Sequence, residues 1–267
     1  MDHPLVKIPR ATTLNFVMIS ISIGILSSLG LLFPHLVYPD AELRSTFMPN
    51  DFVNLVVGLP VLLVPLWLAR RDRLSGVLLL PGALFFVVYS FIPYVWALFP
   101  SITALPYALL VIFSGILIFQ ILKGLDWTAL KGCLQGRVWE RFAGSVLIIL
   151  ALLILGRNVG VLLGSSPIAK TELAVLAADF AIVPFWFGGG LSLWKRDGFV
   201  YGAGLGLLYQ SSMLYLALVV LMVAQPFLTG KSFPAADILV IAGMGIICLV
   251  PFLMFVRGVE RKELPTH

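Results

Sequence analysis

The sequence is poor in charged residues, histidine and cysteine, and each shortage argues against a class of protein. Only 12% of its 267 residues are charged, whereas soluble domains carry about 25%. The three histidines, His3, His35 and His267, cannot build a membrane-embedded metal site or a paired haem ligation. Cys133 and Cys248 form no C-x-x-C motif, which argues against disulfide, zinc and dithiol redox chemistry. We therefore expect no metal and no other cofactor.

Motifs of enzymes and of nucleic-acid-binding proteins are also scarce. No lysine lies in the middle of a long apolar segment, which excludes a retinal Schiff base, and no serine has a histidine base at matching depth. The glycine runs 188–190 and 202–206 lie inside apolar segments and follow no strand, so they favour close helix packing over a nucleotide-binding loop. No basic patch is interleaved with aromatic residues. We expect neither an enzyme nor a partner of nucleic acid.

Apolar residues, by contrast, are abundant: 60% of the chain is hydrophobic and its mean hydropathy is +1.04. A helix of about 20 apolar residues crosses the hydrocarbon core of a bilayer. The first such segment is too long for a signal peptide. The sequence predicts an all-α fold, a polytopic bundle of eight transmembrane helices that forms one transmembrane domain over residues 1–267 in contact with the lipid bilayer. The predicted segments are residues 13–34, 52–69, 75–98, 101–122, 142–163, 173–194, 198–225 and 236–256.

The cations are divided unevenly between the two sets of segment boundaries. If the N-terminus is cytoplasmic, 14 of the 18 lysines and arginines fall on the cytoplasmic side, and Arg44, Arg157, Lys170 and Lys231 remain outside. This is the asymmetry that the positive-inside rule requires. It also explains the net charge of +5 without a nucleic-acid partner. We expect a multi-pass protein of the cytoplasmic (inner) membrane of a prokaryote, with both termini in the cytoplasm.

One pattern occurs twice, 128 residues apart. Asp51-Phe52 precedes a Leu-Trp pair and a basic stop, as does Asp179-Phe180. Each of these segments is followed by an outgoing segment, one with Tyr89-Ser90 and the other with Tyr209-Gln210. The pattern predicts a parallel duplication of a four-helix unit, with repeats of about 1–128 and 129–267. The alternative is coincidence, because Leu-Trp-basic endings are common at any cytoplasmic boundary.

Helix rise places several polar residues in one layer in the outer half of the bundle. Asp179 lies 16 residues before Lys195, which is about 24 Å from the inner boundary. Arg157 reaches the same depth, and Gln210 lies at about 21 Å with Tyr209 beside it. A charge in lipid costs at least ~2.5–3.5 kcal/mol, so these side chains should face the bundle interior. They form either a pocket for a small polar or ionic ligand, open to the outer face, or a structural Arg157–Asp179 ion pair.

The acid of the first repeat lies close to the outer boundary. Asp51 follows the stretch His35–Asn50, which we interpret as the longest outer loop. Asn50 or Asp51 is therefore expected to cap the second helix, because their side chains satisfy free backbone amides at a helix start. In the other interpretation Asp51 binds ligand, and Asn54, Ser90 and Tyr94 continue the polar layer.

Two stretches, Asn50–Arg71 and Asp179–Gly202, resemble an uncharacterised family of bacterial polytopic inner-membrane proteins. In that family a Gln-Asp pair opens the second helix, and an Asp…Pro…Leu-Trp-basic helix precedes one that carries a lysine. Here Asn50 replaces the glutamine, and Gln210 lies near the position of the lysine. The resemblance implies no activity, and the missing lysine argues against an Asp–Lys ionic switch.

Two functions from different classes follow. The first is a small permease or ligand-binding membrane protein, which predicts a polar cavity open to the outside and a strong dependence on Asp179. The second is a non-catalytic membrane subunit or scaffold for a partner subunit, which predicts a sealed bundle and an Arg157–Asp179 contact.

Overall fold

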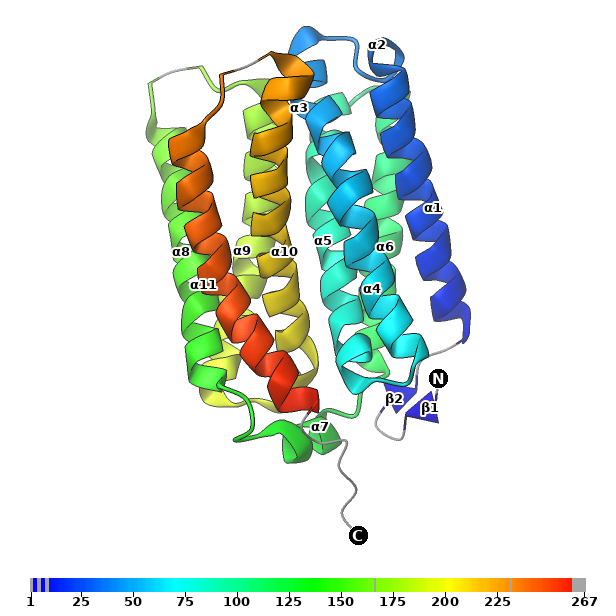
Figure 1. Ribbon diagram of the computed structural model, residues 1–267, viewed down its shortest axis with the longest axis vertical. Helices are drawn as coiled ribbons and strands as arrows, with labels where there is room; N and C mark the ends of the chain where they lie inside the picture. Colours follow the sequence, from blue (N-terminus) through cyan, green and yellow to red (C-terminus); the bar gives the residue numbers. More distant parts are fainter. Residues whose placement is uncertain (1, 4–5, 8–9, 166, 231, 261–267) are drawn as a thin grey trace.

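The computed structural model describes residues 2–3, 6–7, 10–165, 167–230 and 232–260, and its long helices run side by side (Figure 1). Within these ranges, eight helices are long and apolar enough to cross a membrane. The prediction of an all-α polytopic bundle is confirmed. Helices suit a membrane because they pair their own backbone groups, and hydrocarbon offers these groups no other hydrogen-bond partner.

Six of the eight spans in the described residues are single helices, and the second and fourth spans are built from consecutive pieces. The single helices are α1 (Arg10–Leu32), α5 (Leu74–Leu98), α8 (Glu140–Leu163), α9 (Lys170–Lys195), α10 (Gly198–Thr229) and α11 (Ala235–Glu260). The fourth span joins the 3-10 helix η2 (Ile102–Ala104) and α6 (Leu105–Lys123). The second span joins α3 (Ala41–Val53), the π-helix η1 (Asn54–Gly58) and α4 (Leu59–Arg70).

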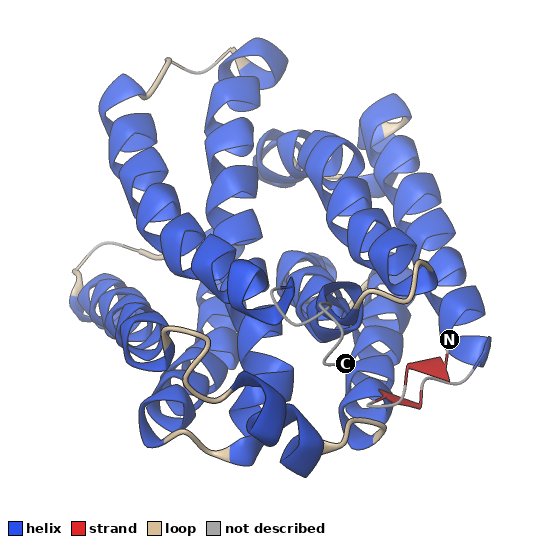
Figure 2. Cartoon of the chain, turned by 60° about the horizontal axis from the view of Figure 1, so that its bottom comes forward, coloured by secondary structure: helices blue, strands red, loops and turns tan. Residues whose placement is uncertain are grey.

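Short elements connect the spans. They are α2 (Pro34–Val37) and α7 (Trp127–Leu134). The strands β1 (Asp2–His3) and β2 (Val6–Lys7) form a small antiparallel pair near the start of α1 (Figure 2). None of these elements alters the helical fold class.

The second span begins at Ala41, eleven residues before the predicted start, and this corrects the sequence-based prediction of a long outer loop. Most of the stretch His35–Asn50 is helical. Leu43 and Phe47, four residues apart on one face of α3, are both buried against the bundle. Packing of this face therefore overrides the polar residues and the proline of α3, which make its sequence resemble a loop.

The helices form two groups, one from each half of the chain, that meet along α5 and α10 (Figure 1). In the first group α1 packs on the second span and α6 packs on α5; in the second, α8 packs on α9 and α11 packs on α10. Across the junction α5 contacts α9, and α10 contacts α3. In each pair, the third span of one half contacts the second span of the other half, as a parallel duplication predicts. The duplication and its boundaries near residue 128 remain a prediction.

Glycines allow the closest helix contacts. A Cβ at Gly82 of α5 would collide with the backbone of Gly206 in α10, and a Cβ at Gly206 would lie 2.9 Å from the Gly82 nitrogen. Gly144 of α8 and Gly190 of α9 form a second such pair, in which each Cβ would lie 2.6–2.7 Å from the other's carbonyl oxygen. Both glycine runs of the sequence thus serve close packing, with α5 and α8 as the tightest neighbours.

The end of the bundle at which α1 begins and α11 ends is rich in cations. It is the lower end in Figure 1, and α7 lies there too. Its described cations include Arg70, Arg71, Arg73, Lys123, Lys131, Arg137, Lys195, Arg196 and Arg257. Arg71 lies over the Trp67 ring, 3.8 Å from its centroid, which anchors both side chains at the interface. We propose that this end faces the cytoplasm.

Replacing Gly82 by alanine should weaken the contact between α5 and α10. We expect Gly82→Ala to lower the free energy of unfolding by about 1–3 kcal/mol, because the added methyl group has no space. Gly115→Ala is the matched control, since a Cβ at Gly115 meets nothing within 4 Å. Thermal unfolding of both variants in one detergent is the measurement, and equal midpoints would contradict this role of Gly82.

Reporter fusions test the orientation. A fluorescent protein fused to the C-terminus should be bright, and alkaline phosphatase fused there should be inactive, because its disulfides form only outside the cytoplasm. Phosphatase fused after Pro100, in the turn between α5 and η2, should be active. The opposite pattern would reverse the proposed orientation.

Candidate functional site

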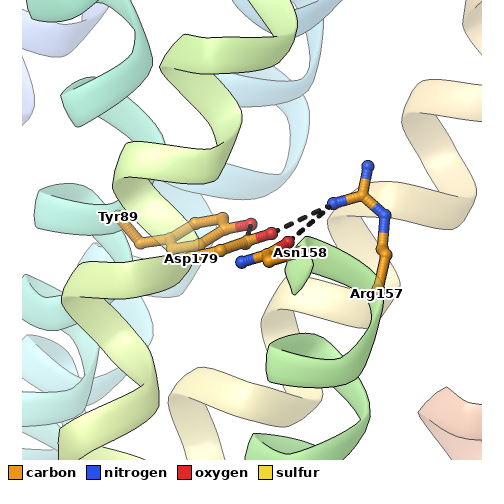
Figure 3. A network of polar contacts seen from close by, with 4 residues as sticks. All are labelled: Tyr89, Arg157, Asn158 and Asp179. Atoms are coloured by element: carbon orange, nitrogen blue, oxygen red, sulfur yellow. Dashed lines mark hydrogen bonds and ion pairs between the residues drawn. The ribbon is translucent and has the colours of Figure 1, made fainter. Parts of the chain in front are cut away.

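Asp179 is the centre of a polar contact between three helices (Figure 3). The Tyr89 hydroxyl of α5 donates to Asp179 Oδ1 at 2.8 Å, and the Arg157 guanidinium of α8 donates to Oδ2 at 3.2 Å. The same guanidinium nitrogen donates to Asn158 Oδ1 at 3.2 Å. The structure therefore brings together Arg157 and Asp179, as their equal depth in the sequence suggested, and adds Tyr89 as the second donor.

The two charged partners differ greatly in exposure. The Asp179 side chain is 5% exposed, whereas 52% of the Arg157 side chain is exposed on the outside of the bundle. The tyrosine is thus the interior partner of the carboxylate, and the arginine reaches it from the periphery. Because an arginine stem is apolar and its head polar, the stem can pack on apolar surface while the head reaches a polar region.

Gln210 does not join this group. Its Oε1 accepts a hydrogen bond from Trp186 Nε1 at 2.7 Å, and both side chains are buried between α9 and α10. Trp186 is seven residues after Asp179 on α9, about 10 Å away along the helix axis. Helix rise predicted a shared layer because it assumes that both helices start level and run straight.

Tyr209 has a different role from the predicted one. Its hydroxyl donates to the Val61 carbonyl of α4 at 3.0 Å. That carbonyl has no α-helical donor, because Pro65, four residues later, has no N–H group. Tyr209 therefore satisfies a backbone acceptor that a proline has freed.

Asp51 is completely buried, and it does not cap a helix. It lies near the C-terminal end of α3, where Tyr38 donates to its Oδ2 at 2.6 Å and Tyr94 donates to its Oδ1 at 3.0 Å. The amide of Asn54 in turn donates to the Tyr94 hydroxyl at 3.2 Å. None of the described lysines, arginines or histidines forms a salt bridge with Asp51.

Aromatic rings and a glycine enclose the Asp51 carboxylate. The ring of Tyr94 lies 4.4 Å from Phe47 and 4.9 Å from Tyr107, measured between centroids. On α1, a Cβ at Gly30 would collide with the Asp51 carboxylate and the Tyr38 hydroxyl. Gly30 is therefore required for this close approach of α1. The carboxylate is shielded from water and is held by hydroxyl groups.

A cavity of about 150 Å³ lies beside the tyrosines that bind the two acids, and neither acid itself lines it. α5 contributes Tyr89 and Tyr94 to its wall, so each wall tyrosine donates its proton to a different carboxylate. Val175 of α9 and several leucines of α10 complete the wall. Its polar lining residues are Thr46, Asn50, Asn54, Tyr89, Ser90 and Tyr94. We take this cavity as the candidate site.

A bond between α3 and α9 bridges the outer end of the cavity. Glu42 Oε1 accepts from the Thr171 hydroxyl at 2.7 Å and from the Thr171 amide at 3.1 Å. Glu42 precedes the lining residue Thr46 by one helical turn, and Thr171 precedes the lining residue Val175 by one turn. The bundle is therefore bridged at the end where the sequence predicted an open pocket.

The sequence reasoning missed Tyr38, Tyr89 as a donor to Asp179, and the Glu42–Thr171 bond. Tyr38 and Glu42 lie in the stretch interpreted as a loop, so nothing placed them against other helices. The signal that was available is the tyrosine on each outgoing segment. Within the part of the chain that the structure describes, no three His, Cys, Asp or Glu side chains are grouped so as to hold a metal ion.

No protein-family model matches the chain, and no curated protein or solved structure is significantly similar to it.

The different burial of the two Asp179 partners predicts different costs of removing them. Tyr89→Phe leaves Oδ1 of a buried carboxylate without its donor, which should cost about 1–3 kcal/mol of unfolding free energy. Arg157→Gln removes a partner that is half exposed, and we expect less than about 1 kcal/mol. Thermal unfolding in detergent checks the order, and a larger loss for Arg157→Gln would show that the ion pair dominates.

Proposed function

We propose that this integral membrane protein binds a small polar or ionic ligand in the cavity beside Tyr89 and Tyr94, as a small permease or a ligand-binding membrane protein. The observation that carries the proposal is the cavity itself. Two tyrosines of α5 line it, and each of them donates to a different buried carboxylate. Polar groups at membrane depth are costly, and a functional role explains why they are retained.

The size and position of the cavity limit the ligand. A volume of about 150 Å³ accommodates several water molecules, an ion or a very small metabolite, and it is too small for a lipid. The cavity lies where the two halves of the chain meet, between α3 and α5 of the first half and α9 and α10 of the second. A site at the interface of two repeats is typical of transporters that move one half against the other.

The Glu42–Thr171 bond supports a gate at the outer end. It joins the two halves one turn outward of the cavity, and Glu42 itself is exposed. A hydrogen bond at an exposed end can exchange with water at little cost, so the halves can part there. In this proposal the structure represents a state closed to the outside, and the protein is neither an enzyme nor dependent on a cofactor.

A second function is favoured by a specific contact. The Arg157–Asp179 ion pair and the two glycine pairs are what a non-catalytic membrane subunit or scaffold requires to lock its helices. In that case the polar groups only fix the packing, and a partner subunit rather than a ligand gives the protein its role.

Ligand-dependent thermal unfolding separates the two functions. A compound that binds the native state raises the unfolding midpoint. Across a panel of ions and small neutral, acidic and basic metabolites, we expect at least one to raise the midpoint of the wild type and to lose its effect in Asp179→Asn.

Tyr209→Phe is the control, because Tyr209 donates to a backbone carbonyl outside the cavity. It should respond to the compound like the wild type. If no compound of any charge shifts the wild type and Asp179→Asn only melts lower, the scaffold function is supported instead.

A further inference from the structure

The two acids beside the cavity differ in their partners. Asp179 has Arg157 as its counterion at 3.2 Å. Asp51 is 0% exposed, and the neutral tyrosines Tyr38 and Tyr94 donate to its carboxylate. A buried charge without an opposite charge is costly, because the interior cannot replace the hydration that it has lost. An ionised Asp51 therefore has no counterion among the described residues.

The two tyrosine hydroxyls of the cavity wall offer lone pairs instead of protons. Tyr89 and Tyr94 donate their only O–H groups to Asp179 and Asp51, so their oxygens can only accept from anything in the cavity. Since these hydroxyls are bonded to carboxylates, their oxygens carry more negative charge than those of free phenols. An anion would find no hydroxyl donor at either tyrosine.

Amide and backbone oxygens add to this set of acceptors. Asn54 directs an N–H to Tyr94, and Asn50 directs an N–H to the Thr46 carbonyl at 3.0 Å, which leaves both Oδ1 atoms as acceptors. Pro93 also lines the cavity and has no N–H for the carbonyl of Tyr89, four residues before it. Carbonyl and hydroxyl oxygens are the ligands that alkali cations take in place of water.

The π-helix η1 determines the position of Asn54. Asn54 is its first residue, and the Leu59 N–H bonds to the Asn54 carbonyl five residues back, as a π-helix requires. This wider turn comes directly after the segment that carries Asp51, and it places the Asn54 amide beside Tyr94. Single π-turns inside α-helices occur frequently at functional sites, where they redirect a side chain.

We propose that the cavity binds one monovalent cation, an alkali ion or ammonium, which supplies the missing charge beside Tyr94 and Asn54. Asp51 lies directly behind Tyr94, 3.0 Å from its hydroxyl, and acts on the cation through that oxygen. This inference rests on the proposed function, because it names the charge of the ligand that the cavity takes. It makes Tyr94 the contact residue and Asp51 the positioning residue.

Thermal unfolding of the full chain in detergent tests the cation. Sodium, potassium and ammonium chloride replace N-methylglucamine chloride at constant pH and ionic strength. For at least one of them we expect a saturable rise in the midpoint of the wild type. Tyr94→Phe, which retains the ring but loses the oxygen, should need about tenfold more cation for half the effect, and Asp51→Asn should not respond.

Tyr209→Phe is the control, since its hydroxyl donates to the Val61 carbonyl and it does not line the cavity. Its midpoint should respond to the cation like that of the wild type. If Asp51→Asn does not yield folded protein, the comparison of Tyr94→Phe with Tyr209→Phe is the deciding test. An equal response of these two variants would overturn the proposal.

Three other results would also overturn it. Midpoints equal to those in N-methylglucamine for all three cations would exclude the site. A midpoint that follows pH and ignores the cations would assign the missing charge to a proton. A shift by neutral or anionic compounds alone, abolished by Asp179→Asn, would retain the proposed function and remove the cation from it.

Discussion

The constraint on which this structure depends is that hydrocarbon offers no hydrogen bonds, so each polar group within it must find a partner in the protein. Tyr209 meets this requirement for a carbonyl that Pro65 has freed, and Trp186 meets it for Oε1 of Gln210, whose Nε2 has no partner in the described residues. Tyr38 and Tyr94 do the same for the carboxylate of Asp51. The hydroxyl of tyrosine recurs because its ring packs among apolar side chains while its tip still donates.

The helix α5 contacts both halves of the bundle. Tyr89 and Tyr94 are five residues apart on it, which rotates one side chain by about 140° from the other. One therefore points to Asp179 on α9 and the other to Asp51 on α3. On a further face, Gly82 allows α10 to approach closely. A single helix thus contacts both acids and the second half of the chain, and it leaves the cavity between its two tyrosines.

The sequence was sufficient for the eight spans and for the pairing of Arg157 with Asp179, because hydropathy and helix rise determine length and height in the membrane. It was insufficient to predict the direction in which a side chain points from its helix. Gln210 was assigned to the Asp179 layer from its height, yet it faces Trp186 two turns away. The sequence predicts a helix cap at Asp51 because the preceding residues include Glu42, Arg44 and Pro49, which make this stretch resemble a loop. Only the packing of Leu43 and Phe47 shows that this segment is helical and that its acid is buried.

Arg157 connects the interior of the bundle to its lipid surroundings. Half of its side chain is exposed on the outside of the bundle, while its guanidinium holds Asp179. Arginines in such positions draw water and phosphate headgroups inward and thin the bilayer locally. Those same groups compete with Asp179 for the guanidinium. The thickness and headgroup charge of the surrounding bilayer therefore influence how firmly Arg157 holds Asp179, which in turn binds Tyr89 of the cavity wall.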